Sequence, residues 1–232
     1  MASTSAKRVP ERVKDDRAAF VWGGAGVSVG FIGVVVTSAF YLASPQAAAM
    51  PHASLDVNLA IEGAIRGATT MHLAGLFGVL GDVTIAAGCL MIAVDQLARK
   101  KADAAFGWLL IGVCAVLFAI VDSMVGFVLS PVAAQAGIGA FVTVKKLFDT
   151  LFLLGTATFG AGAGLALGPA ALARSRDVPR ALAVPGVVIG FIGAVAGIAC
   201  LAGGDLYVLI GPSVTGNSVI FALAGLNIAR RS

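Results

Sequence analysis

The chain has 232 residues, of which 59% are hydrophobic and only 12% are charged, and its formal net charge is +4. A soluble domain averages about 45–50% apolar and about 25% charged residues, and one of this size has too little interior to hide so much apolar surface. The composition therefore excludes an ordinary soluble fold and predicts an all-α, polytopic membrane protein. The basic residues fall in short runs between apolar stretches, which indicates orientation in a membrane rather than nucleic-acid binding.

Residues 1–19 are polar and charged, and we expect a short cytoplasmic tail there. A first transmembrane span is predicted at residues 20–43. A cleaved signal peptide is the alternative, because the small residues at 46–49 resemble a cleavage site. The apolar stretch is longer than the ~7–15 residues of a signal h-region and matches the ~20 residues of a span, which favours a retained anchor.

Residues 44–70 form the longest connection, punctuated by Pro45 and Pro51. Apolar and charged residues recur at helical spacing over residues 54–69, which predicts a short helix lying at the outer membrane interface. Glu62 and Arg66 are four residues apart and can pair along one side of that helix. A partly ordered loop is the alternative.

Five further apolar runs follow, separated by polar or turn-forming segments. Pro131 is expected to end the third span, and residues 131–144 are expected to form a loop with a helical start. The predicted spans after the first cover residues 70–94, 104–129, 147–167, 182–201 and 206–228.

The sixth run has an unusual centre. Gly211-Pro212 is followed by Ser213-Val214-Thr215-Gly216-Asn217-Ser218, in which every residue except Val214 is a hydroxyl, amide or glycine residue. Proline within a helix removes a backbone hydrogen bond and clashes one turn back, so we expect a kink or a break. A structural kink is one interpretation. A broken helix that lines a substrate or ion site, with Asn217 among its ligands, is the other.

The distribution of basic residues predicts the orientation. Thirteen of the sixteen Lys and Arg residues lie in the tail, in the connections after the second and fourth spans, and at the C-terminus. The other three are Arg66, Lys145 and Lys146. The positive-inside rule then places both termini in the cytoplasm, which requires an even number of spans and agrees with six apolar runs.

Glycines recur four residues apart in three of the spans. Because lipid is as apolar as leucine, membrane helices associate where small residues let their backbones approach. These ridges predict helix contacts, within one chain more readily than between chains. They comprise Gly26 and Gly30, Gly160, Gly164 and Gly168, Gly186 and Gly190, and Gly193 and Gly197.

Two aspartates lie inside predicted spans, where ionisable groups are energetically unfavourable and are candidates for function. At 1.5 Å per residue, Asp82 lies roughly 18 Å and Asp122 roughly 12 Å from the outer ends of their spans, so they can share a depth. We predict an interior polar cluster that shares a proton or binds a cation, and a hydrogen-bonded clasp between helices is the structural alternative. The cluster consists of Asp82, Thr84, Asp122 and Ser123.

The remaining candidates are weaker. Asp149 follows Lys145 and Lys146 at spacings that suit a local ion pair, although an inward binding role stays open. His72 is interpreted as an interface residue, and His52 lies in the outer loop. No metal-ligand pattern, haem-ligand pair or catalytic motif such as GxSxG, HExxH or Walker A is present, so no cofactor, metal or catalytic residue is predicted.

Three short motifs border or enter spans: Ile65-Arg66-Gly67, residues 151–155 with Phe159-Gly160, and residues 175–182. On these motifs the chain resembles a bacterial family of integral membrane proteins of similar length and span count, defined only as a domain of unknown function. The chain departs from that pattern at Leu172-Ala173-Arg174, where a tyrosine is expected. The resemblance implies the six-span architecture and supplies no activity.

Three functions are compatible with the sequence. The first is a non-enzymatic scaffold or accessory component, favoured by the glycine ridges and the missing catalytic motifs. The second is a small transporter or an ion or proton pathway that uses Asp82 and Asp122. The third is a membrane-embedded enzyme acting on a lipid or quinone, which a lateral opening toward lipid with His72 and Asp149 converging would favour. In each case we expect a multi-pass protein of the bacterial cytoplasmic membrane, with lipids and a second copy or a larger membrane complex as partners and no nucleic acid.

Overall fold

The computed structural model describes residues 11–43, 56–173, 175 and 177–230, and within these ranges the regular structure is helical without a strand. Six helical segments are long and apolar enough to cross a membrane, which confirms the predicted multi-pass helical fold. Part of the expected tail, residues 1–10, lies outside the described residues, as do His52, Pro45, Pro51 and the small residues at 46–49. The six segments are Ala18–Ala43, Ala68–Ala98, Ala102–Gln135, Gly137–Leu172, Arg180–Leu201 and Tyr207–Ala229.

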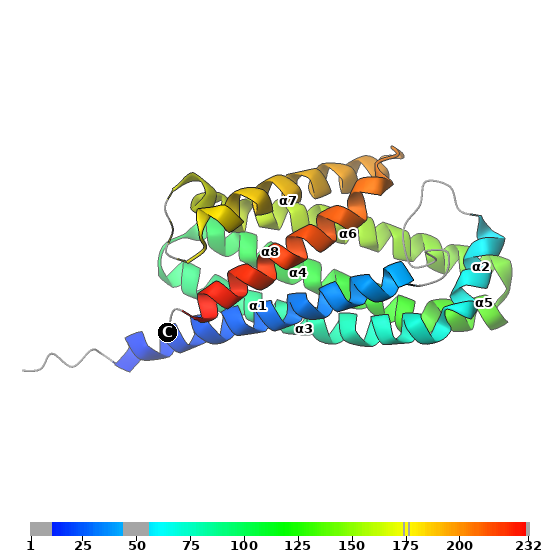
Figure 1. Cartoon of the computed structure of the whole chain (residues 1–232), viewed down its shortest axis with the longest axis horizontal. Helices are drawn as coiled ribbons and strands as arrows, with labels where there is room; N and C mark the ends of the chain where they lie inside the picture. Colours follow the sequence, from blue (N-terminus) through cyan, green and yellow to red (C-terminus); the bar gives the residue numbers. More distant parts are fainter. Residues whose placement is uncertain (1–10, 44–55, 174, 176, 231–232) are drawn as a thin grey trace, which may run out of the picture.

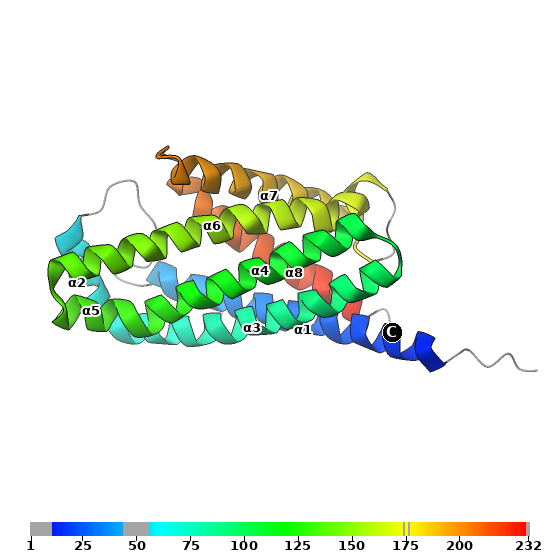
Figure 2. The same cartoon turned by 180° about the vertical axis from the view of Figure 1, so that it is seen from behind.

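The six long helices form a closed ring in which each packs against two neighbours (Figures 1 and 2). Around the ring the order is α1, α3, α4, α6, α7, α8 and back to α1. The beginning of α1 and the end of α8 lie at one end of the bundle, called here the terminal end, and α2 lies at the other, the α2 end. The helices are α1 (Glu11–Ala43), α3 (Ala68–Ala98), α4 (Ala102–Met124), α6 (Gly137–Leu172), α7 (Arg180–Leu201) and α8 (Ile210–Ala229).

The short helix expected before the second span is α2 (Val57–Arg66), which lies crosswise at the end of the bundle (Figure 1). Its N-cap is Asp56, whose side chain accepts hydrogen bonds from the backbone N–H groups of Asn58 and Leu59, both at 3.1 Å. Glu62 and Arg66 form the predicted ion pair on its exposed side.

The prediction that Pro131 ends the third span and that residues 131–144 form a loop is wrong. A π-helical turn, η2 (Val125–Leu129), follows α4, and the chain continues as α5 (Ser130–Gln135) before α6 begins at Gly137. Pro131 is the second residue of α5, which directly follows the π-helical turn, so the helical segment Ala102–Gln135 runs through this proline. Phe141 is fully buried against the core, so the start of α6 is held by packing that its weakly apolar sequence did not reveal.

The sixth span also differs from expectation. A 3-10 turn, η3 (Tyr207–Leu209), precedes α8, and α8 then continues without a break from Ile210 to Ala229. Pro212 therefore falls in the first turn of the helix, where no backbone N–H is needed. The broken helix predicted for the middle of this span is not found.

Close helix contacts occur at glycines in several places. A Cβ at Gly30 of α1 would lie 2.6 Å from the carbonyl oxygen of Gly81 in α3, and a Cβ at Gly160 of α6 would lie 2.2 Å from that of Gly190 in α7. Gly164 and Gly168, by contrast, meet nothing within 4 Å. Successive glycines spaced by four advance about 40° around the helix, so the ridge of α6 turns away from α7 after its first member.

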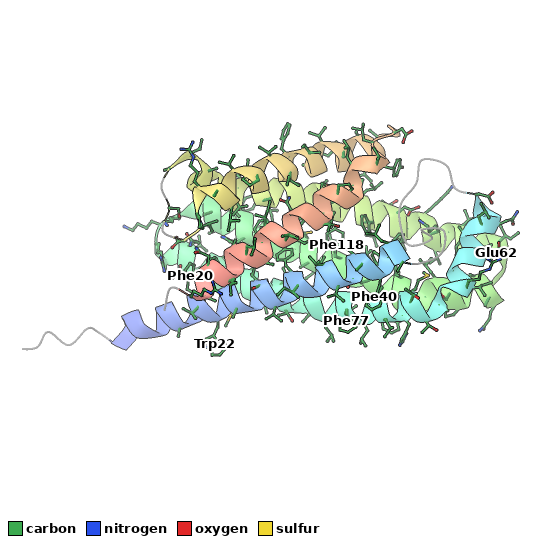
Figure 3. The ribbon with its side chains drawn as sticks, viewed as in Figure 1. Phe20, Trp22, Phe40, Glu62, Phe77 and Phe118 are labelled. Atoms are coloured by element: carbon green, nitrogen blue, oxygen red, sulfur yellow. The ribbon has the colours of Figure 1, made fainter. Side chains whose placement is uncertain are left out.

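The core consists of two buried clusters, one toward each end of the bundle. The cluster toward the terminal end is aromatic at its centre, and the other joins α2 and the start of α6 to the middle helices. Phe118 of α4 packs against both. Large apolar side chains such as Trp22, which projects away from the bundle in Figure 3, cover the outer surface, as expected where lipid is the solvent.

Candidate functional site

A cavity of about 290 Å³ lies inside the half of the bundle toward the α2 end. Five of the six ring helices contribute to its wall: α1, α3, α4, α6 and the beginning of α8. α7 contributes none of the lining residues. The lining contains apolar side chains and a group of polar ones that includes two carboxyl groups. It is formed by Val34, Thr37, Ser38, Tyr41, Leu42, Asp82, Phe118, Asp122, Phe152, Gly211, Pro212, Val214 and Thr215.

Asp82 and Asp122 both line this cavity, at similar depth on the neighbouring helices α3 and α4. Counting from the terminal end at 1.5 Å per residue, Asp82 lies roughly 24 Å and Asp122 roughly 30 Å along its helix. Their exposed fractions are 1% and 5%. The two side chains are close enough to interact electrostatically and to share a hydrogen bond, which requires one of the two carboxyl groups to carry a proton.

The hydrogen bonding of the two carboxyl groups differs. Asp122 Oδ1 accepts a hydrogen bond from the Tyr41 hydroxyl of α1, whereas Asp82 Oδ2 makes none with the described residues. A Cβ at Gly78 would lie 1.7 Å from Asp122 Oδ2, so this glycine makes the space that the carboxyl group fills. Two neighbouring carboxylates repel one another in a low dielectric, and a proton or a cation between them relieves that repulsion.

The exposed residues of the cavity lining, Leu42 and Pro212, belong to α1 and α8, and this side of the cavity is called here the opening between α1 and α8. These helices touch near the terminal end, where a Cβ at Gly24 would lie 2.8 Å from the carbonyl oxygen of Gly225, and they diverge toward the α2 end (Figure 1). The rim carries Leu42, which is 84% exposed, and the exposed Pro212. Phe118 lies in the interior beside this opening, as Figure 3 shows.

Toward the terminal end, an aromatic barrier closes the bundle. A void of about 10 Å³ continues from Asp82 to Phe31 and Phe159, with room for at most one water molecule. Phe31 stacks on Phe159 and on Phe221 with ring centroids 5.6 Å and 5.4 Å apart, and Trp108 meets Phe221 edge-on at 5.5 Å. We call Phe31, Trp108, Phe159 and Phe221 the aromatic barrier.

A second pocket, of about 660 Å³, lies beyond the barrier at the terminal end, and Trp108 belongs to its lining. Asp177, between α6 and α7, joins several elements there. Its carboxyl group pairs with Lys101 at 3.1 Å and with Arg99 at 3.7 Å, and its carbonyl oxygen accepts a hydrogen bond from Asn227 Nδ2 at 2.7 Å. These contacts link the connection after α3, the connection after α6 and the end of α8.

No protein-family model, curated protein or solved structure matches this chain.

The structure itself brings Asp82 and Asp122 together and places Thr84 and Ser123 outside the cavity. The Thr84 hydroxyl donates to the Leu80 carbonyl oxygen and the Ser123 hydroxyl to that of Ala119, each one turn back in its own helix.

Asp149 and Asn217 also lie away from the cavity lining. Asp149 forms an ion pair with the buried Lys145. The Asn217 amide faces the backbone of α7 and, in the orientation that satisfies both of its groups, donates to Gly186 O at 3.0 Å and accepts from Gly190 N at 3.1 Å. Asn217 thus fastens α8 to α7.

His72 lies apart from both carboxyl groups of the cavity, with its Nδ1 3.3 Å from the Gly126 carbonyl oxygen and its ring edge-on to Phe127. His72 and Asp149 therefore have separate partners. Among the described residues, no group of three or more His, Cys, Asp or Glu side chains is placed to hold a metal ion.

Sequence reasoning did not single out Tyr41 or Phe118. Tyr41 is one of two tyrosines and lies near the end of a span, where aromatic residues usually mark the membrane interface. Its side chain is buried instead. One sequence feature could have pointed to Tyr41. Two carboxyl groups inside spans need hydrogen-bond donors, and the neighbouring spans offer few donors at the same depth.

Proposed function

We propose that this protein is a small membrane transporter that carries a positively charged cargo bound by Asp82 and Asp122. The observation that carries the proposal is a cavity inside the bundle that reaches two buried carboxyl groups, one with an oxygen that has no hydrogen-bond partner among the described residues. Ionisable residues within a membrane mark substrate and ion pathways, because burying them without such a role is unfavourable. A cation supplies both the missing partner and the missing charge.

The aromatic barrier fits a carrier better than an open channel. A carrier exposes its binding site to one side at a time, so one side of the site must be closed in any single state. Here the site communicates with the opening between α1 and α8, and the barrier separates it from the pocket at the terminal end. Transport then requires the rings of Phe31, Phe159 and Phe221 to move apart. This movement connects the binding site with the pocket at the terminal end.

We also propose that the terminal end faces the cytoplasm of a bacterium and that the protein lies in its cytoplasmic membrane. The support is the distribution of basic residues in the sequence, where thirteen of the sixteen Lys and Arg residues belong to the tail, to the connections after the second and fourth spans and to the C-terminus. The cavity then opens in the outer half of the membrane.

The test measures uptake of radiolabelled cations into liposomes that contain the purified protein. Uptake of sodium and of ethylammonium is followed after a potassium diffusion potential, negative inside, is imposed. We expect at least one of the two cations to enter several-fold faster than into empty liposomes, with Asp82→Asn and Asp122→Asn reducing the rate to background.

The matched control is Asp205→Asn, which makes the same chemical change in the exposed turn after α7. This variant should retain the wild-type rate. If wild type and Asp82→Asn give the same rate with every cation tested, the transporter proposal is rejected.

A scaffold or accessory role is the second candidate, and one observation favours it. Gly164 and Gly168 of α6 meet nothing within 4 Å, so this part of the ridge is free to receive a helix of a second copy or of another membrane protein. Substituting Gly164 with Ile should then lower the oligomeric mass measured in mild detergent. The enzyme alternative needs both a lateral opening and convergence of His72 and Asp149, and these two residues have separate partners.

A further inference from the structure

We infer that the cargo is a lipophilic primary amine and that it reaches Asp82 sideways, from the membrane, through the opening between α1 and α8. This inference rests on the proposed function and specifies the class of its substrate. Three observations carry it: the chemistry of the cavity wall, the unpartnered oxygen of Asp82, and the position of the opening.

The wall of the cavity favours an apolar body. Phe118, Phe152 and Val214 face it from three different helices, and Leu42 and Pro212 stand at its rim. A hydrated inorganic ion would leave these surfaces in contact with water, which is unfavourable. An aromatic or aliphatic group of the cargo instead buries them and adds ring contacts with the two phenylalanines.

The polar end of the cavity favours an ammonium group. The Tyr41 hydroxyl already donates to Asp122, so it is not available to bind an anion. Asp82 Oδ2 is buried and has no hydrogen-bond partner among the described residues, so as a carboxylate oxygen it can accept from a cargo, and the second carboxyl group beside it adds to the attraction for positive charge. A primary ammonium carries three N–H donors, enough to serve both carboxyl groups at once.

The route follows from which sides are closed. The aromatic barrier blocks the approach from the terminal end. The opening lies between two spans, α1 and α8, and its exposed rim residue Leu42 is apolar, so it faces the region where a lipophilic amine concentrates. An amine dissolved in the membrane therefore meets the site without crossing the bundle.

Binding of radiolabelled 2-phenylethylamine to the protein in phosphatidylcholine nanodiscs tests the inference by equilibrium dialysis, with empty nanodiscs as the background. Two matched probes change one feature each: ethylamine lacks the ring, and 3-phenylpropanoate replaces the ammonium with a carboxylate. Thr215→Trp fills the opening without altering either carboxyl group.

We expect one saturable site for 2-phenylethylamine, at least about tenfold weaker binding of ethylamine, and no saturable binding of 3-phenylpropanoate. Asp82→Asn and Thr215→Trp should each weaken binding roughly tenfold or more, and Asp205→Asn should leave it unchanged. Gel-filtration profiles identical to wild type establish that the variants are folded. If Asp82→Asn does not fold, Thr215→Trp and the three probes still decide the outcome.

Each contrary result has a distinct meaning. Equal binding of ethylamine and 2-phenylethylamine, lost in Asp82→Asn, rejects the lipophilic cargo and leaves the cation transporter standing. Wild-type affinity in Thr215→Trp rejects the sideways route. Absence of saturable binding by either amine, together with cation fluxes at background in liposomes, rejects both the inference and the proposed function.

Discussion

Tyr41 is the side chain that holds the Asp122 carboxyl group in place from across the helix interface. Removing its hydroxyl leaves a buried carboxyl oxygen without its donor, and this costs about 1–3 kcal/mol for a group of this kind. We predict that Tyr41→Phe lowers the free energy of unfolding by that amount, measured by titration with dodecyl sulfate in mixed micelles.

Tyr207→Phe is the control, because it deletes the hydroxyl of the other tyrosine, in the short turn before α8. It should change the free energy of unfolding by less than about 0.5 kcal/mol. An equal effect of the two variants would show that the Tyr41–Asp122 hydrogen bond adds nothing to the fold.

Individual residues were predictable from sequence to different degrees. Asp82 and Asp122 stand out because a carboxyl group inside an apolar run needs a reason to be there. Thr84 and Ser123 were grouped with them by proximity in sequence, yet a hydroxyl within a helix readily bonds to the carbonyl one turn back. Tyr41 could not be assigned, since burial of a residue near a span end depends on its tertiary neighbours.

The glycines of α6 give a test at the scale of a helix pair. A Cβ at Gly160 would collide with the backbone of α7, whereas one at Gly164 meets nothing. We predict that Gly160→Ala destabilises the protein by about 1–3 kcal/mol in the same dodecyl sulfate titration. Gly164→Ala should leave the stability unchanged or raise it by up to about 1 kcal/mol, because alanine is the better helix former. Equal destabilisation by both variants would contradict the α6–α7 packing described above.

Whole elements were predictable where apolar length alone decides them. The first, fifth and sixth spans lie within about two residues of the predicted bounds, which is the usual uncertainty of helix ends. The beginning of α6 was missed because residues 137–146 are only weakly apolar in sequence, and the burial of Phe141 and Lys145 depends on their tertiary neighbours. The π-helical turn η2 has no sequence signal that composition or periodicity reveals.

The orientation of the whole molecule is testable with single cysteines. The three native cysteines are buried, so they should not react with a membrane-impermeant maleimide. Arg66 and Lys100 are exposed at opposite ends of the bundle. We predict that Arg66→Cys is labelled in intact cells, and that Lys100→Cys is labelled only after the cells are permeabilised. The reverse pattern would place the termini outside and the cavity in the inner half of the membrane.

The closed ring and its cavity belong to the molecule as a whole, and the sequence predicted neither. The cavity exists because α1 and α8 touch at Gly24 and Gly225 and then diverge, and the angle between two helices is set by all of their neighbours. Local hydropathy predicts the number of spans. It does not predict the cavity between them, which depends on the angles at which the helices pack.

The central claim is that the carboxyl groups of Asp82 and Asp122 bind a cation. Infrared difference spectroscopy of the protein in lipid, recorded without and with ethylammonium chloride, observes these groups directly. The account predicts carboxyl bands that change on addition of the cation and that are lost in both Asp82→Asn and Asp122→Asn but kept in Asp205→Asn. A difference spectrum without carboxyl bands, or one that the double variant Asp82→Asn/Asp122→Asn reproduces, would contradict it.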